Sequence, residues 1–409
     1  MKTDTHLFKS IEVAGGMRHK SSIPDAMPEI GFRLNELFKP PLLSGHRIQP
    51  LINGDQIFSS MLQAIAEAQQ EICFETFIYS SGEIAQQFAT ALIDAGERGV
   101  KIFVLLDWWG AKDIDVDLIE HMHNAGVSIR FFNPLRWWQL HRMNYRTHRK
   151  ILVVDRKLAF TGGVGIAKEW QGNARSPDEW YDIHYRIMGP IVRNIREAFR
   201  ELWSEVLQEP LLCPDDDTPP ARHSTDTVAA QVLSSSPRGG SELIYQLFRY
   251  ALDTATDSVQ ITTAYFVPDQ DMISAIISAV ERGVKVEVMV PGPHIDSQIV
   301  RYSSKASWGK LLSAGVRILI YQPTMLHAKT TIIDNDWTIL GSANFDNRSF
   351  SLNDEIILNV CSEEFTATHR KIFIENCEHC QLFSYEDWRR RGLISRLKEV
   401  LSDFLRPHL

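Results

Sequence analysis

One stretch of sequence occurs twice in the 409-residue chain, once in each half. Residues 96–106 match residues 280–290, and residues 125–130 match residues 314–319. In each copy a helical pattern ends at Arg-Gly-Val-Lys and continues into an apolar run of strand length, which is typical of a helix that connects two strands. The repeat predicts an α/β fold of two pseudo-twofold lobes, each an α-β-α sandwich with its own sheet.

Each half also contains a His-x-Lys-x4-Asp motif with an apolar, partly β-branched run before the aspartate. Side chains alternate along a strand, so the histidine and the lysine of each motif are expected on one face. A single copy is as consistent with solvated residues on a surface strand, but two copies at matched places in a repeat favour a functional site. The motif residues that we assign to catalysis are His148, Lys150, Asp155, His327, Lys329 and Asp334.

Two imidazoles and two ammonium groups are what a protein needs to attack a phosphodiester. One histidine attacks phosphorus, the other protonates the leaving oxygen, and the lysines neutralise the phosphoryl oxygens. No carboxylate cluster with metal-ligand spacing accompanies the motifs, so we expect neither a metal nor a cofactor. Asp155 and Asp334 are better suited as buried partners of backbone or basic groups than as ligands. The expected active site is the interface of the lobes, where the motifs meet.

Each histidine also needs a carboxylate on its far nitrogen to fix the tautomer and to stabilise the imidazolium. The candidates are Asp182, which follows the first motif, and Glu355, which follows the second. Both lie in strand-like segments. The alternative for each is a surface carboxylate that pairs with a nearby arginine.

A glycine turn follows each motif and is expected to contact the phosphate. In the second half the turn includes Ser342 and Asn344, whose hydroxyl and amide groups can bond phosphoryl oxygens. In the first half Gly163 allows close backbone approach, and Gly165 stands where the second half has Asn344. The site is therefore asymmetric, or a water or another side chain occupies that place.

Composition narrows the class of protein. The chain is 44% hydrophobic and 23% charged, as in folded globular proteins, and its length suffices for two cores. A net charge of −8 argues against a general nucleic-acid binder, so no nucleic acid is expected as a partner. Five cysteines without framework spacing indicate reduced thiols, as in the cytoplasm.

The pattern along the chain predicts five parts. They are an irregular leader (1–47), a first lobe (48–208), a Pro-, Asp- and Ser-rich linker (209–240), a second lobe (241–385) and an amphipathic tail (386–409). The tail has apolar positions at helical period, and it either packs on the lobes or lies on a membrane. No apolar run has the length of a membrane-spanning helix, so any membrane contact is expected to be peripheral.

A segment before the first motif is both basic and aromatic, which suits a lipid headgroup region. The alternative is a loop that packs its tryptophans onto its own lobe. Two more tryptophans end a strand in the same half, where they either line an acyl-chain channel or pack in the core. The residues assigned to membrane or lipid contact are Trp108, Trp109, Arg136, Trp137, Trp138, Arg142 and Arg146.

Residues from about 48 to 409 resemble the phospholipase D superfamily with two His-Lys-Asp motifs. Within it the chain is most similar to bacterial cardiolipin synthases of the type without transmembrane helices. Gly165 departs from the asparagine that is usual in the first motif of this family. The resemblance rests on residues 74–78, on Leu105-Leu106-Asp107 with Gly110, on His148-Arg149-Lys150, and on residues 341–344 with Asp346, Arg348 and Ser349.

This resemblance implies transfer of a phosphatidyl group in two steps, with phosphatidylglycerol giving cardiolipin and glycerol. It implies that His148 is the nucleophile and that His327 is the general acid and base. It also implies a phospholipid substrate and a peripheral position on the cytoplasmic side of the inner membrane. Hydrolysis of phospholipids, cleavage of another phosphodiester such as nucleic acid, and a non-catalytic scaffold are the alternatives.

Overall fold

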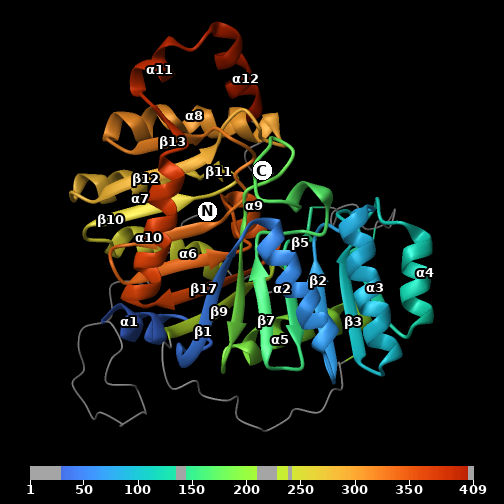
Figure 1. Cartoon of the computed structure of the whole chain (residues 1–409). Coiled ribbons are helices and arrows are strands. Elements are labelled where there is room, and N and C mark those ends of the chain that lie inside the picture. The colour runs from blue at the N-terminus through green and yellow to red at the C-terminus, as the bar shows by residue number, and fades with distance from the viewer. Residues whose placement is uncertain (1–28, 135–143, 210–227, 238–241, 404–409) are drawn as a thin grey trace, which may run out of the picture.

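The computed structural model describes residues 29–134, 144–209, 228–237 and 242–403. Two α/β lobes lie side by side, and their strands form one continuous mixed sheet (Figure 1). The order of the strands across this sheet is β18-β13-β12-β10-β14-β15-β17-β9-β1-β8-β7-β6-β2-β3-β4. The α/β class with two related lobes is confirmed.

In lobe 1, three parallel strands are followed by three antiparallel ones, because the chain first crosses over through helices and then turns back through tight connections. The parallel strands are β2 (Glu71–Thr76), β3 (Lys101–Asp107) and β4 (Ser128–Phe132), and the antiparallel strands are β6 (Ile151–Val154), β7 (Leu158–Gly162) and β8 (Ile183–Met188). The helices are α2 (Asn53–Glu67), α3 (Glu83–Glu97), α4 (Val116–Asn124) and α5 (Val192–Leu207), with a 3-10 turn at Lys168–Trp170.

Lobe 2 repeats this order of elements and adds an edge strand, β18 (Cys380–Phe383). Its parallel strands are β10 (Ser258–Thr262), β12 (Lys285–Pro291) and β13 (Arg317–Tyr321), and its antiparallel strands are β14 (Thr330–Ile333), β15 (Trp337–Gly341) and β17 (Asn353–Cys361). Its helices are α6 (Leu243–Thr254), α7 (Gln270–Glu281), α8 (Gln298–Ala314) and α10 (Glu363–Cys377). Four short elements lie near the centre of the molecule: β5 (Arg146–Thr147), β11 (Phe266–Val267), β16 (Phe345–Asp346) and α9 (Asn347–Ser351).

The repeated Arg-Gly-Val-Lys has a structural role in both lobes. Arg98, which follows α3, donates to the carbonyl of Ile65 in the last turn of α2 at 3.1 Å. Arg282, which follows α7, donates to the carbonyl of Leu252 in the last turn of α6 at 2.6 Å. The glycine that follows has φ of +86° at Gly99 and +95° at Gly283, a conformation that favours glycine. The repeat therefore fixes how each helix turns into its strand.

The two halves of the sheet are joined by two strands that the sequence did not predict. Strand β1 (Leu43–Ile52) pairs with β8 of lobe 1, and β9 (Val228–Ser235) pairs with both β1 and β17. The expectation of a separate sheet in each lobe is therefore wrong. The reason is that an antiparallel strand from each lobe leaves an unpaired edge, and these two strands close the gap between them.

Two predicted boundaries also differ from the structure. Helix α1 (Glu29–Leu37) lies within the predicted leader, and Leu34 and Phe38 are buried in the core of lobe 2. Strand β9 lies within the predicted linker. Both segments bury apolar side chains that a free leader or linker would leave in water.

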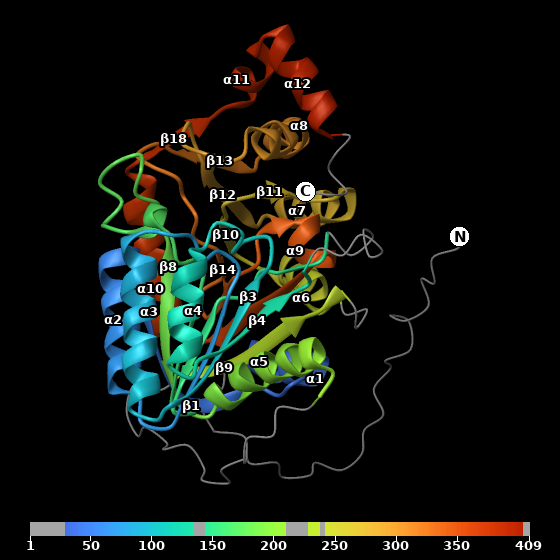
Figure 2. The same cartoon turned by 90° about the vertical axis from the view of Figure 1, so that its right-hand side faces the viewer.

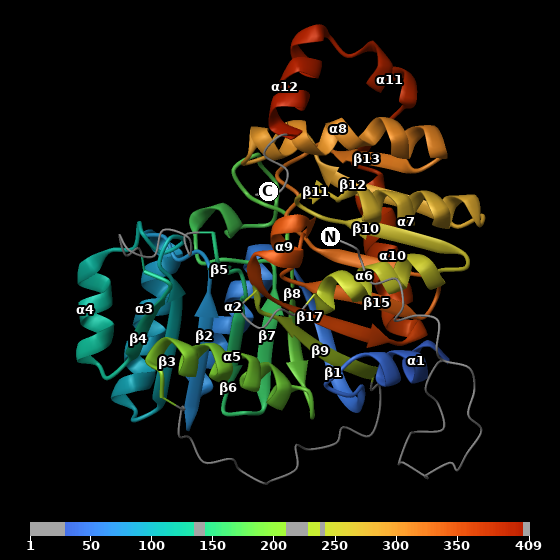
Figure 3. The same ribbon diagram turned by 180° about the vertical axis from the view of Figure 1, so that it is seen from behind.

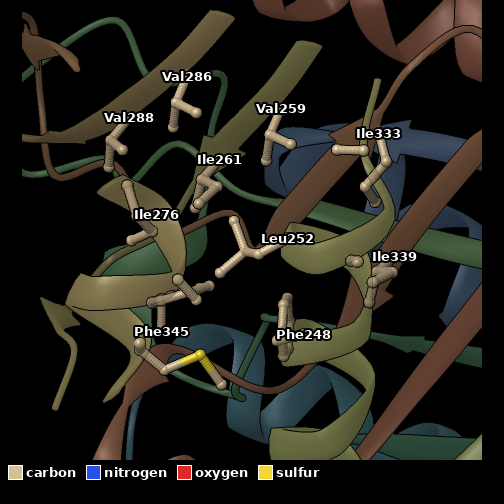
Figure 4. Close-up of a cluster of buried hydrophobic side chains, with 14 of the residues drawn as sticks. Phe248, Leu252, Val259, Ile261, Ile276, Val286, Val288, Ile333, Ile339 and Phe345 are labelled. Atoms are coloured by element: carbon tan, nitrogen blue, oxygen red, sulfur yellow. The ribbon is translucent and has the colours of Figure 1, made fainter. Parts of the chain in front are cut away.

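Helices cover both faces of the sheet. Helices α2, α3 and α10 lie over the face seen in Figure 1, and α5, α6 and α7 lie over the opposite face (Figures 2 and 3). In lobe 2, Phe248 and Leu252 of α6 pack against Val259 and Ile261 of β10, together with Ile276 of α7 (Figure 4). The strands are apolar on both faces because both are covered.

The last described helices are α11 (Tyr385–Arg390) and α12 (Leu393–Asp403), which lie beyond α8 at the outer end of lobe 2 (Figures 1 and 3). Within the described residues, none of the helices combines the length and the apolar character that crossing a bilayer requires.

Candidate active site

Both His-x-Lys motifs open onto one pocket between the lobes. In each motif the histidine and the lysine precede a strand, β6 in lobe 1 and β14 in lobe 2, so the two pairs approach each other where the lobes meet. The pocket is lined by Phe77, Ile78, Arg146, His148, Lys150, Trp170, Trp180, Tyr265, Asp296, His327, Asn344, Asp346, Arg348, Ser349 and Asn353.

Each histidine pairs with the carboxylate of the other lobe. His148 Nδ1 lies 2.9 Å from Glu355 Oε1, and His327 Nδ1 lies 2.7 Å from Asp182 Oδ2. In the sequence, Asp182 follows the motif of His148 and Glu355 follows the motif of His327. In the structure each acid instead bonds the histidine of the other lobe. Because Nδ1 of each ring faces a carboxylate, Nε2 is the nitrogen left for chemistry in the pocket.

The exchange has its origin in the backbone. The backbone N–H of His148 donates to the carbonyl of Asp354 at 2.9 Å, and that of His327 donates to the carbonyl of Tyr181 at 2.7 Å. In both cases the accepting residue directly precedes the paired acid. The short strand β5 also pairs in parallel with the start of β17. Each motif is thus bonded, main chain to main chain, to the segment that carries the acid of the other lobe.

Both motif lysines are buried beside their histidines. Lys150 Nζ donates to the carbonyl of His148 at 2.7 Å, and Lys329 Nζ lies 3.1 Å from His327 Nε2. Burial lowers the pKa of Lys150 to about 7 and that of Lys329 to about 8, although nearby carboxylates oppose the shift. Arg149 points away, as strand alternation predicts, and donates to backbone carbonyls of Ala198 and Ser235.

Burial also sets the protonation of the histidines. It lowers the pKa of His148 to about 4, with Lys150 acting in the same direction and Glu355 opposing, and it lowers the pKa of His327 well below its ordinary value. Burial raises the pKa of Asp182 to about 6. For Glu355, burial is outweighed by His148 and Lys150, so the pKa is lowered. Burial therefore disfavours the cationic form of both imidazoles.

The two acids are held by different donors. Glu355 accepts a hydrogen bond from the hydroxyl of Ser342, whereas Asp182 accepts one from Trp170 Nε1 at 3.0 Å. Gly163 stands where lobe 2 has Ser342, and a β-carbon there would overlap both carboxylate oxygens of Asp182. Ser342 and Gly163 therefore contact the orienting acids, and their contact with phosphate stays a prediction.

Trp170 also explains why lobe 1 has Gly165 at the position of Asn344 in lobe 2. A β-carbon at Gly165 would lie 3.1 Å from Trp170 Cζ3 and 3.0 Å from Ile78 Cβ. The indole thus covers the place that corresponds to Asn344 in lobe 2, and the pocket is asymmetric. Asn344 itself lines the pocket, and its buried Oδ1 has no hydrogen-bond partner among the described residues. An amide in that state is available to a bound group.

The motif aspartates lie at the far end of the strands that follow the motif histidines and lysines. Asp155 accepts from the backbone N–H groups of Gln69, Gln70 and Glu71, and Asp334 accepts from those of residues 256–258. Neither lines the pocket. Each carboxylate thus binds backbone groups, as expected from the sequence, and holds the loop that leads into β2 or β10.

The predicted lipid-contact residues are only partly described. Arg146 is buried in the pocket wall, 3.5 Å from Asp107, so a lipid contact of this residue stays a prediction for the pocket and not for an outer surface. Trp108 and Trp109 do not line the pocket, and Trp109 is half exposed. Their proposed role as channel walls therefore has no support in this pocket. Arg136, Trp137, Trp138 and Arg142 lie outside the described residues.

The aromatic walls of the pocket come from residues that were not assigned to the site. The ring of Phe77 lies 5.4 Å from that of His148, and the rings of Trp170 and Trp180 lie 5.2 and 5.3 Å from that of His327. These rings cover part of both imidazoles, and both histidines are buried. Trp180 could have been found from the sequence, because it stands two residues before Asp182.

Further polar groups line the lobe 2 side of the pocket, and of these Tyr265 and Asp296 were not named from the sequence. Tyr265 corresponds to Ile78 of lobe 1, since Thr263 and Thr76 bond the carbonyls of these two residues in the same way. The Tyr265 hydroxyl donates to Asp296 Oδ2 at 2.5 Å. Arg348 also lines the pocket. Among the described residues, no three His, Cys, Asp or Glu side chains gather in a way that would hold a metal ion.

Comparison with known proteins identifies the family. The family model described as "Cardiolipin synthase, PLD-like domain" matches residues 61–203 and 248–377. Cardiolipin synthase A of Pseudomonas fluorescens (strain SBW25) is 32% identical over 98% of this chain and 81% of that protein. A cardiolipin synthase of Geobacillus kaustophilus (strain HTA426) is 33% identical over 88% of this chain and 72% of that protein.

A solved structure shows the same fold. The phosphatidylserine synthase of Haemophilus influenzae Rd KW20 superimposes with a TM-score of 0.71, over 93% of this chain and 99% of that chain, at 12% sequence identity. Together with the matched family model, these findings show that the chain is an enzyme of the phospholipase D superfamily and belongs to its cardiolipin synthase-like family.

Proposed function

We propose that the protein is a phosphatidyltransferase that makes cardiolipin and glycerol from two molecules of phosphatidylglycerol. The observation that carries this proposal is the shared pocket, which is lined by two histidines that are each bonded to a carboxylate of the other lobe, with Lys150 in its wall and Lys329 buried beside His327. Relatives named cardiolipin synthase, which match most of the chain, support the choice of substrate.

In the first step, Nε2 of His148 attacks phosphorus and the bond from phosphorus to the glycerol oxygen breaks. That oxygen takes a proton from His327, which leaves a phosphatidyl group on His148. Lys150, Lys329 and the amide of Asn344 stabilise the phosphoryl oxygens as negative charge develops on them. The anionic diester between the lysines also favours the protonated form of His327, which burial alone disfavours.

In the second step, a hydroxyl of another phosphatidylglycerol attacks phosphorus while His327 accepts its proton. The bond from phosphorus to His148 breaks, and cardiolipin leaves with the imidazole restored. Water competes with the lipid hydroxyl for the same intermediate. The aromatic walls of Phe77, Trp170 and Trp180 limit its access. We further propose that the protein takes its lipids from a membrane surface at which it is peripheral.

The product profile tests the function. Vesicles of phosphatidylglycerol are incubated with the protein, and lipids are read by mass. The expected result is cardiolipin with an equal amount of free glycerol and little phosphatidic acid. Phosphatidic acid as the main product on both anionic and zwitterionic vesicles would show a hydrolase instead. Cleavage of bis-p-nitrophenyl phosphate or DNA, with no lipid turned over, would leave only the phosphodiesterase chemistry.

A further inference from the structure

Helix α12 is oriented with its apolar side chains toward solvent. Ser395, Glu399 and Ser402 face the body of the protein, and Glu399 and Ser402 are 2% and 8% exposed. The apolar side chains of the same helix are 61 to 81% exposed. These exposed side chains are Leu393, Ile394, Leu397, Val400 and Leu401.

Polar bonds hold this orientation. Glu399 pairs with Arg391 at 2.7 Å and accepts from Ser395 at 3.0 Å, so the buried carboxylate is satisfied. Arg391 in turn lies over the ring of Trp388, 3.5 Å from its centre. Trp388 is fixed on α8 by a bond from its Nε1 to the carbonyl of Lys305. The helix therefore does not need its apolar side chains to attach it to the protein.

The exposed side chains form a continuous stripe with basic flanks. At about 100° per residue, the five apolar positions cover an arc of about 120° on the helix. Arg396 and Lys398 stand about 100° to either side of the middle of that arc. A narrow apolar stripe with a cation on each edge is the pattern of a helix that lies in the headgroup region of an anionic bilayer.

The stripe runs toward the pocket. Trp388 contacts Gly309 and Lys305 of α8, whereas Lys398 contacts Tyr302, so the chain from α11 to α12 runs antiparallel to α8. The end of α12 thus approaches the first turn of α8, which begins two residues after Asp296 of the pocket. Figure 3 shows α12 beside α8 at the outer end of lobe 2.

We propose that α12 is a membrane-docking surface: its stripe (Leu393, Ile394, Leu397, Val400, Leu401) inserts into the headgroup region of an anionic bilayer. The inference deepens the proposed function and rests on it for its purpose, since a lipid-transferring enzyme has to meet its substrate at a bilayer. A second copy of the chain is the other possible occupant. In a symmetric dimer the stripes of two copies would face each other, and the basic residues on their edges would then lie close together. Repulsion between these like charges disfavours such a dimer.

Vesicle binding tests the surface. The triple variant Leu397→Gln, Val400→Gln, Leu401→Gln is compared with the wild type by sedimentation with vesicles that contain phosphatidylglycerol. A leucine-sized side chain that leaves water contributes about tenfold to partitioning, so binding is expected to fall at least about 100-fold. The matched control is Val116→Gln with Ile374→Gln, two exposed apolar residues on other helices, and it is expected to bind as the wild type does.

The charged flanks are tested separately. Arg396→Gln with Lys398→Gln is expected to lower binding to anionic vesicles by about 30-fold, because each cation near the surface contributes about fivefold. High salt is expected to mimic this loss on the wild type and to have little effect on this variant. Lys371→Gln, at an exposed lysine of α10, is the control.

Turnover of a dispersed short-chain phospholipid measures catalysis without membrane binding, so it distinguishes a failure of the docking surface from a failure of the proposed function. The triple variant is expected to match the wild type there and to melt at the same temperature. Unchanged vesicle binding by the triple variant would overturn the docking surface and leave the proposed function standing. A wild-type dimer that the triple variant dissociates, without any change in vesicle binding, would assign the stripe to a second copy. Vesicle binding without any lipid turnover would overturn the function and leave the surface standing.

Discussion

Nδ1 of His148 lies 2.9 Å from Oε1 of Glu355, although 207 residues separate the two in sequence. The second pair, His327 with Asp182, spans 145 residues in the opposite direction. Neither lobe contains a complete His–acid pair of its own. The proposed chemistry therefore needs both lobes, and their relative position is part of the active site.

Removing the charge of Glu355 is expected to lower kcat strongly. In Glu355→Gln the ring of His148 loses the carboxylate that fixes its tautomer and stabilises its cationic form, so kcat should fall by about 10²–10⁴-fold with little change in KM. Steady-state kinetics and circular dichroism measure this. Glu287→Gln, at a carboxylate outside the pocket, is the control. Activity near the wild-type level with fold intact would contradict the role of the pair.

Trapping labelled lipid on the protein assigns the two histidines. His148→Ala is expected to prevent any covalent phosphatidyl-enzyme, because the attacking nitrogen is gone. His327→Ala is expected to label slowly, since protonation of the leaving oxygen contributes about 10²–10⁴-fold. The measurement is the rate of label incorporation after a rapid acid quench. Labelling of His148→Ala but not of His327→Ala would reverse the roles.

Gly163→Ala is expected to reduce activity at a position that carries no reacting group. The added β-carbon would overlap the carboxylate of Asp182 and displace it from His327. A loss of at least about tenfold in kcat is expected from a misplaced orienting acid. Gly392→Ala, where a β-carbon meets no neighbour within 4 Å, is the control and should behave as the wild type. Equal activity of the two variants would refute this assignment of Gly163.

The value of kcat/KM is expected to fall as the pH rises through the range from about 7 to about 8. Burial lowers the pKa of Lys150 to about 7 and that of Lys329 to about 8, and a lysine is a cation only below its pKa. The positive charges of the two lysines, which bind the phosphodiester, are therefore lost as the pH rises above these values. Lys150→Arg keeps its charge at high pH, so its decline should begin later. A wild-type profile that stays flat up to about pH 10, the ordinary lysine range, would contradict the lowered values.

Asp334→Ala is expected to reduce stability rather than catalysis. The carboxylate accepts hydrogen bonds from the backbone N–H groups of residues 256–258, which are left without it. The free energy of unfolding should fall by about 1.5–3 kcal/mol, the typical contribution of a hydrogen bond to a charged group. Denaturant titration and kcat per folded molecule measure the two effects. Glu281→Ala, at an exposed helix position, is the control. A loss of kcat with unchanged stability would show that Asp334 takes part in catalysis.

The sequence by itself determined the repeat, the two lobes and the motif histidines and lysines that lie where the lobes meet. These features are local, because a motif of three residues followed by an apolar strand specifies both its chemistry and its secondary structure. Asp182 and Glu355 were also recognisable as orienting acids. Their partners were not, since sequence order placed each acid behind the motif of its own half.

Tertiary structure decided the rest. The exchange of acids follows from backbone hydrogen bonds between segments of different lobes, such as that from His148 to Asp354, and no local pattern records such a pairing. Gly163 looked like a phosphate contact, whereas the packed structure gives its space to Asp182. Likewise, helical period in the tail predicted an apolar stripe but not its direction. The stripe faces outward because the polar side of α12 is bonded to Arg391 and through Trp388 to α8, and the position of α8 against the tail is set by the fold.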